Sequence, residues 1–238
     1  MVNTEHTSKQ FDAELESVRA RVLQMGGLVE DQIVRALESL SSGDTALAAQ
    51  VVDDDHRVNA LEVAIDEDCS TIIARRQPAA SDLRMILMIV KTITDLERIG
   101  DEAAKIARIT QAIFESDRRY IPRVVEVKHV ADIALGMLRN SLDAFARLDI
   151  TVSARVVRQD ERVDDEFKLI LRQLITFMME DPRTISQALE ILFIAKAIER
   201  IGDHAKNMSE YVVYMVKGKD VRHTGVEAIE REALSGNS

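Results

Sequence analysis

The chain carries one five-residue stretch twice, as Glu97-Arg98-Ile99-Gly100-Asp101 and as Glu199-Arg200-Ile201-Gly202-Asp203. Both copies lie in long stretches without proline, where apolar residues recur at helical spacing, so both predict helix. An α-helix has 3.6 residues per turn, which places the Glu and the Asp of each copy on one face, one turn apart.

The same face carries the apolar residues of each predicted helix. In the first copy Glu97 falls inside the apolar stripe and Asp101 lies at its edge. A carboxylate in an apolar seam is costly unless it is paired, protonated or bound to a cation. A Gly inside a helix costs about 1 kcal/mol relative to Ala. Its presence at matching places in both copies, Gly100 and Gly202, indicates a close-packed site.

The composition predicts an all-α protein. With 238 residues and 46% hydrophobic content, the chain is long enough to bury one or two cores. Only 4% of the residues are aromatic, none is Trp, and Gly and Pro number 9 and 3, which favours long helices over sheets. The single cysteine, Cys69, falls on a core-facing position and is interpreted as a structural thiol.

The charge and hydropathy exclude several classes of partner. A net charge of −10 argues against nucleic acid, which selects basic surfaces, and against adhesion to an anionic membrane. The sequence has no apolar run of 18 residues and no signal-peptide pattern. We therefore expect a cytoplasmic protein without direct membrane insertion.

An internal repeat of three helices organises the chain. Residues 51–59 align with 156–164 at an offset of 105, and the two pentapeptides align at an offset of 102. The predicted architecture is therefore two tandem antiparallel three-helix bundles. We place the first repeat at 8–117, the second at 121–218, and a mobile tail at 219–238.

Turn signals divide each repeat into its helices. The segments 41–44, 77–81 and 181–184 contain Gly, Pro or Asp and predict breaks, with Asp44 as a helix N-cap. The second helix is expected at 45–76. Gly26-Gly27 interrupts the first helix and indicates a kink or a close crossing.

The hairpin geometry brings acids of neighbouring helices to the same level. Residues at equal distances on either side of a turn face each other, and both turns contain a proline, Pro78 and Pro182. The second repeat then forms a cluster of four carboxylates: Asp160, Asp164, Glu199 and Asp203. The first repeat forms a cluster of three carboxylates and one amide: Asp55, Asn59, Glu97 and Asp101.

These two clusters are candidate metal sites. Four close carboxylates raise one another's pKa and do not all stay ionised without a cation. All-oxygen ligands suit Mg²⁺, Mn²⁺, Ca²⁺ or iron, and we expect a divalent or trivalent metal (Mg, Mn, Fe or Zn) whose identity the spacing leaves open. Ordinary ion pairs with Arg98 and Arg200 are the alternative. His204 is interpreted as a surface or interface residue, and the pair Glu62 and Asp66 as a solvated edge.

The motifs together resemble the PhoU family. The extended repeats 95–103 and 197–205 carry the resemblance, in order and at matching spacings with four further segments: 11–16, 75–78, 81–84 and 143–147. The resemblance covers about residues 10 to 223.

The resemblance implies a negative regulator of phosphate uptake and of the phosphate-starvation response. The family works with the ATPase subunit of the phosphate-specific ABC transporter and with a phosphate-sensing histidine kinase. Members are often dimeric, and some bind metal clusters through Glu/Asp-x-x-x-Asp motifs, which match Glu97/Asp101 and Glu199/Asp203 here. Asn59 stands where the second repeat has Asp164, so the first cluster departs from the full pattern.

The leading hypothesis is therefore a non-enzymatic, metal-binding adaptor, expected as a homodimer. A metal-dependent phosphohydrolase or a metal-storage protein built on the same acids is the alternative. A third possibility is a helical bundle whose acids form only ion pairs. The sequence contains no phosphate-binding Gly-rich loop and no recognisable nucleophile triad.

Overall fold

The computed structural model describes residues 9–115 and 124–221, together with positions 224, 227, 229 and 231. Six long helices and one short 3₁₀ helix make up its elements: α1 Lys9–Ser42, α2 Thr45–Arg76, α3 Ala80–Glu115, α4 Val124–Arg147, α5 Ile150–Glu180, η1 Pro182–Thr184 and α6 Ile185–Lys217. The described residues contain no strand. This confirms the all-α prediction.

The helix ends follow the local sequence signals. The Asp44 carboxylate accepts a hydrogen bond from the backbone N–H of Leu47 at 2.9 Å, which confirms the predicted N-cap of α2. Gln77 closes the same helix in the left-handed conformation, with φ of 47°. Gly218 closes α6 in that conformation, with φ of 69°, where a residue without Cβ is least strained.

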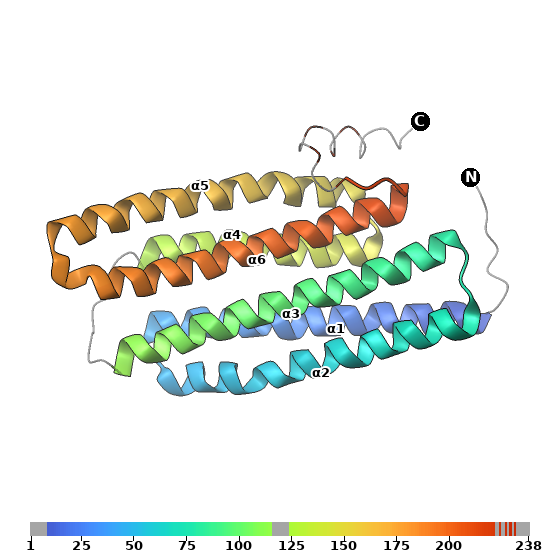
Figure 1. The fold of residues 1–238 in the computed structure, drawn as a ribbon, viewed down its shortest axis with the longest axis horizontal. Helices are drawn as coiled ribbons and strands as arrows, with labels where there is room; N and C mark the ends of the chain where they lie inside the picture. Colours follow the sequence, from blue (N-terminus) through green and yellow to red (C-terminus); the bar gives the residue numbers. More distant parts are fainter. Residues whose placement is uncertain are drawn as a thin grey trace.

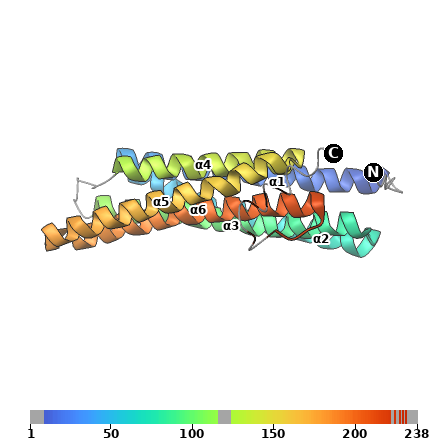
Figure 2. The ribbon, with the colours of Figure 1, turned by 90° about the horizontal axis from the view of Figure 1, so that it is seen from above.

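The six helices form two layers. In Figure 1, α5, α6, α3 and α2 lie side by side in that order, and Figure 2 shows α1 and α4 along one face of this row. Each repeat is a three-helix bundle, with α1–α3 in the first and α4–α6 in the second. The two bundles meet mainly through α3 and α6, which run antiparallel to each other, and also through α1 and α4.

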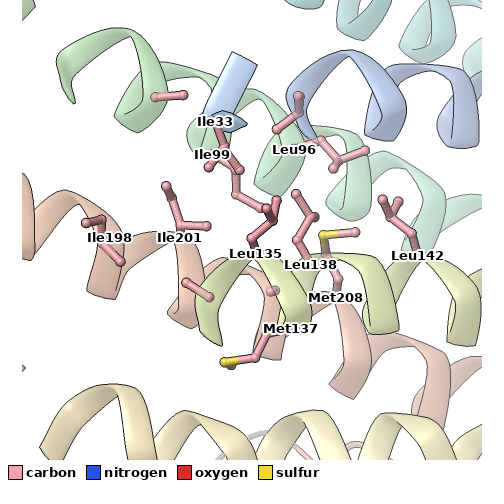
Figure 3. Packing of buried hydrophobic residues seen from close by; sticks show 14 of the residues in the cluster. Ile33, Leu96, Ile99, Leu135, Met137, Leu138, Leu142, Ile198, Ile201 and Met208 are labelled. Atoms are coloured by element: carbon pink, nitrogen blue, oxygen red, sulfur yellow. The ribbon is translucent and has the colours of Figure 1, made fainter. Parts of the chain in front are cut away.

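The apolar core is continuous across the two repeats. Figure 3 shows side chains of α1, α3, α4 and α6 packed together. Ile99 and Ile201, the central residues of the two pentapeptides, both belong to this cluster and are at most 1% exposed. The pentapeptides therefore lie with one face in the contact between repeats and another toward their own hairpins.

Gly26 marks a close crossing of α1 and α4. A Cβ added to Gly26 would stand 2.4 Å from Leu142 Cδ2, whereas a Cβ on Gly27 would meet no atom within 4 Å. The sequence predicted a kink or a close crossing for this pair. The structure confirms the crossing and assigns it to Gly26 alone.

Two residues near the end of the chain pack against the second repeat. Val221 and Ile229 are 3% and 0% exposed and form a small apolar cluster with Ala154, Val157 and Val213. Most of the segment 219–238 lies outside the described residues, so the mobile tail stays a prediction there. The repeat boundaries at 117 and 121 also fall outside the described residues.

None of the helices in the described part of the chain is both long and apolar enough to cross a membrane.

Candidate acidic sites in the two hairpins

In the predicted second-repeat cluster, three of the acids act electrostatically on the fourth, Asp203. Asp160 of α5 is 5% exposed and Glu199 of α6 is 9% exposed, while Asp164 and Asp203 are half-buried. Burial, followed by the charges of Glu199, Asp160 and Asp164, raises the pKa of Asp203 to about 6. The four predicted residues therefore act on one another electrostatically across the α5–α6 hairpin.

Two lysines neutralise half of this cluster. Lys196 Nζ donates to both carboxylate oxygens of Glu199 at 2.6 Å, and Lys206 Nζ donates to Asp160 Oδ2 at 2.6 Å. Neither lysine was selected in the sequence analysis, although Lys196 stands three residues before Glu199 on the same helix, a spacing that favours pairing. Of the described residues, none forms such an ion pair with Asp203.

The first-repeat cluster is looser. Burial raises the pKa of Glu97, and Asp101 raises it further, while Arg98 opposes them. Arg98 lies 3.5 Å from carboxylate oxygens of both Glu97 and Asp101, so the alternative of ordinary ion pairs describes this side of the cluster. Asn59 is exposed.

Glu62, interpreted from the sequence as part of a solvated edge, also acts electrostatically on the first cluster. Its charge and that of Asp55 also raise the pKa of Glu97. Matching residues at equal distances from the turn pairs Glu62 with a position near Thr94. It overlooked Glu97, which stands one helical turn further along α3.

The seam beneath each cluster opens at the pentapeptide glycine. A Cβ added to Gly100 would meet Gln32 Oε1 at 3.1 Å, Asp55 Oδ1 at 3.5 Å and Val58 Cγ1 at 3.5 Å. Gln32 of α1 is 2% exposed, and its Nε2 donates to Asp55 Oδ1 at 3.2 Å. The first cluster thus has a polar floor supplied by a third helix.

The equivalent seam in the second repeat is apolar. A Cβ added to Gly202 would meet Val163 at 3.4 Å and Met137 at 3.7 Å. Figure 3 shows the Met137 side chain pointing away from the other labelled residues. The two clusters therefore carry similar acids, but a polar side chain lies beneath the first and apolar side chains lie beneath the second.

The chemistry of the donors fits a hard cation, whereas their positions do not form a finished coordination shell. Carboxylate oxygens gather in each hairpin, and burial together with neighbouring carboxylates raises the pKa of one acid in each cluster, Glu97 and Asp203. In the described part of the chain, however, no three His, Cys, Asp or Glu side chains are gathered closely enough to hold one ion. Lys196 and Lys206 occupy oxygens that a cation would need.

The remaining charged residues of the pentapeptide region connect the repeats. Arg200 pairs with Glu102 of α3 at 3.1 Å, so it does not neutralise the second cluster. His204 Nδ1 lies 2.6 Å from Asp95 Oδ1, which confirms an interface histidine. Asp95 also accepts a hydrogen bond from Asn207 Nδ2 at 3.3 Å.

Comparison with known proteins finds one family in both repeats and relatives that match nearly the whole chain. The family described as "PhoU domain" matches residues 22–110 and again residues 127–212. The phosphate-specific transport system accessory protein PhoU homolog of Pseudomonas putida is 51% identical over 96% of this chain and 89% of its own length. The phosphate-specific transport system accessory protein PhoU of Escherichia coli is 48% identical over 95% of this chain and 93% of its own length.

Solved structures agree with these sequence relatives. The crystal structure of PhoU from Pseudomonas aeruginosa superposes with a TM-score of 0.85 at 50% identity, and covers 88% of this chain and 100% of that chain. The phosphate transport system regulatory protein PhoU from Streptococcus pneumoniae superposes with a TM-score of 0.82 at 29% identity. This superposition covers 89% of this chain and 99% of that chain.

Proposed function

The chain belongs to the PhoU family, and we propose that it is a cytoplasmic, metal-binding adaptor of a phosphate-specific transport system. In this role it binds the ATPase subunit of the phosphate-specific ABC transporter and a phosphate-sensing histidine kinase. It thereby represses phosphate uptake and the phosphate-starvation response when phosphate is plentiful. The names of relatives at 48–51% identity over nearly the whole chain carry the proposal.

The acidic clusters support the metal-binding part of the proposal. Asp203 stands among three carboxylates that raise its pKa to about 6, and a bound cation would remove that mutual repulsion. The residues that would hold the cation are Asp160, Asp164, Glu199 and Asp203 in the second repeat and Asp55, Glu97 and Asp101 in the first. A cation, when bound, supplies positive charge that lets these acids ionise together.

The lysines suggest how such a site could respond to its occupant. Lys196 and Lys206 hold Glu199 and Asp160 in the structure, and a divalent cation would compete with both ammonium groups for the same oxygens. Binding would therefore free two lysines at the hairpin surface. This change of surface charge is the kind of difference that a partner protein can recognise.

The adaptor role is tested in Escherichia coli cells that lack their own relative. We expect this chain to restore repression of a phosphate-starvation promoter in high phosphate. It should also retain the transporter ATPase and the kinase in a pull-down from phosphate-replete membranes. A variant with Asp160→Asn, Asp164→Asn, Glu199→Gln and Asp203→Asn should lose repression. Asp165→Asn, at an exposed residue of the same helix, is the matched control. Failure of the unaltered chain to retain either partner contradicts the proposal.

We also propose that the chain forms a homodimer through apolar residues that its own bundles leave exposed. Six of them lie on the α5–α6 hairpin: Leu169, Ile175, Met179, Ile185, Leu189 and Phe193. Light scattering across micromolar concentrations should give a dimer mass. A monomer mass throughout that range contradicts this part of the proposal.

The second candidate function is a metal-dependent phosphohydrolase, and Asp203 is the observation that favours it. A carboxyl group with a pKa of about 6 can donate or accept a proton near neutral pH. Turnover of a phosphate monoester by the purified, Mn²⁺-loaded chain, lost in Asp203→Asn, would support this candidate. Cation binding without turnover favours the adaptor.

A further inference from the structure

Gln32 is a buried amide beneath the first acidic cluster, and only one half of it is hydrogen-bonded. Its Nε2 donates to Asp55 Oδ1 at 3.2 Å. Its Oε1 is fully buried and has no hydrogen-bond partner among the residues that the structure describes. Buried side-chain oxygens are normally satisfied, so this one calls for a partner.

The neighbouring carboxylate fixes the orientation of this amide. Turning the amide over would bring Oε1 against Asp55 Oδ1, and two acceptors cannot hydrogen-bond to each other. The oxygen therefore points toward Gly100, 3.1 Å from where a Cβ on that residue would stand. Gly100 lies between Glu97 and Asp101, so the unpaired oxygen is aimed into the acidic cluster.

In the second repeat, a methionine occupies the position equivalent to Gln32. The offset of 105 residues that relates Val58 to Val163 also relates Gln32 to Met137, and both pairs line their pentapeptide glycine. Met137 fills the same space with a thioether and leaves no polar atom unpaired. Gln32 is therefore not required for packing at this position of the fold.

We propose that Gln32 Oε1 is a ligand of the cation bound by the first acidic cluster, together with Asp55, and that it makes this cluster select a hard, oxygen-preferring ion. Carboxylate and amide oxygens from α1, α2 and α3 then surround the ion. The inference rests on the proposed cation binding, and it adds a ligand from α1, a helix on which the acidic motifs do not lie. The second cluster, with Met137 beneath it, lacks this donor.

The test measures Mn²⁺ affinity at the first cluster alone. Glu199→Gln with Asp203→Asn in the full chain removes ligands of the second cluster and serves as the parent. In this parent, Gln32→Met copies the residue of the second repeat, and Gln32→Glu replaces the amide oxygen by a charged one. Gln173→Met removes another unpaired buried amide oxygen, on α5, and is the matched control.

We expect Gln32→Met to weaken Mn²⁺ binding at least tenfold and Gln32→Glu to strengthen it, as ligand charge predicts. The melting temperature of metal-free Gln32→Met should change little, because the substitution conserves volume and because removing the unpaired buried oxygen offsets the lost hydrogen bond to Asp55. Gln173→Met should leave Mn²⁺ affinity unchanged.

Four outcomes overturn the inference, and they differ in what else they affect. Unchanged Mn²⁺ affinity in Gln32→Met shows that the amide oxygen is not a ligand. A lower metal-free melting temperature in Gln32→Met, with weaker binding in Gln32→Glu, shows that Gln32 only positions Asp55. If the unaltered chain binds no Mn²⁺, cation binding itself fails and the ligand role fails with it. If the unaltered chain binds Mn²⁺ but the parent does not, the binding belongs to the second cluster and the first cluster is not a cation site.

Discussion

Asp203 shows how the environment of a single residue links the acidic cluster to pH. Burial and three neighbouring carboxylates raise its pKa from 3.8 to about 6. Between these two values the folded chain binds more protons than the unfolded chain, so this group makes the free energy of unfolding fall as pH rises from about 4 to 6. Above pH 6 the penalty is complete, and below pH 4 it is absent.

We predict that Asp203→Asn stabilises the metal-free protein by about 1 kcal/mol at pH 7.5, after allowing for solvent screening. The difference from the unaltered chain should vanish below pH 4. Carboxyl NMR should place the Asp203 midpoint near 6 without metal and lower with Mg²⁺. Asp181, whose pKa Arg183 lowers by hydrogen bonding, is the internal control. An Asp203 midpoint in the ordinary range would show that the four acids do not face one another.

Asn59 and Asp164 occupy matching positions of the two clusters and predict unequal cation affinities. Asp164 adds a carboxylate to the second cluster, whereas Asn59 brings an amide and is exposed. We expect the second cluster to bind more tightly by about 1–3 kcal/mol, the contribution of one interaction with a charged group. Asn59→Asp should strengthen the first site and Asp164→Asn should weaken the second. Anomalous scattering from Mn²⁺-soaked crystals decides this: metal in the first cluster with an empty second cluster contradicts the ranking.

Two adjacent glycines of α1 have opposite packing environments. Gly26 lets α1 approach Leu142 of α4, while the neighbouring Gly27 faces open space. Gly26→Ala gains helix propensity but forces its Cβ against the Leu142 methyl groups and Cγ.

We therefore predict that Gly26→Ala lowers the free energy of unfolding by about 1 kcal/mol. Gly27→Ala should raise it by about 0.5–1 kcal/mol, because it gains propensity without a clash. Urea denaturation of both variants provides the comparison. Adding Leu142→Ala should remove most of the difference between them. Equal stabilisation by both substitutions would show that α1 and α4 do not cross at Gly26.

A polar pair lies inside the contact between the two repeats. The side chains of Asp95 on α3 and His204 on α6 are 9% and 16% exposed, and they lie 2.6 Å apart. Because α3 and α6 carry the two pentapeptides, this pair fixes the register of the clusters relative to each other. Removing one partner leaves the other buried with fewer hydrogen bonds.

We predict that His204→Ala lowers the free energy of unfolding by about 2 kcal/mol. Combining it with Asp95→Ala should cost less than the sum of the two single substitutions, with a coupling of about 1–2 kcal/mol. Arg147→Ala breaks an exposed pair with Asp143 and should cost less than about 0.5 kcal/mol. Additive effects of Asp95 and His204 would show that the repeats are not joined here.

The sequence alone determined the helices and the hairpin levels. Apolar spacing, the Asp44 cap and the break at Pro78 placed α2 at Thr45–Arg76, because these signals act within one or two turns of the chain. The placement of Asp160 and Asp164 against Glu199 and Asp203 also follows from sequence, since a short turn leaves an antiparallel hairpin only one register.

Only the tertiary structure decided which residues surround those acids. Lys206 reaches Asp160 from the neighbouring helix, and Gln32 reaches Asp55 from a helix more than 20 positions away in the chain. The burial of Ile229 against α5 and α6 was equally hidden, because the apolar residues of the tail are too few for a sustained helical periodicity. Such contacts depend on the rotation and crossing of separate helices. Local spacing fixes neither of these, and packing of the whole core fixes both.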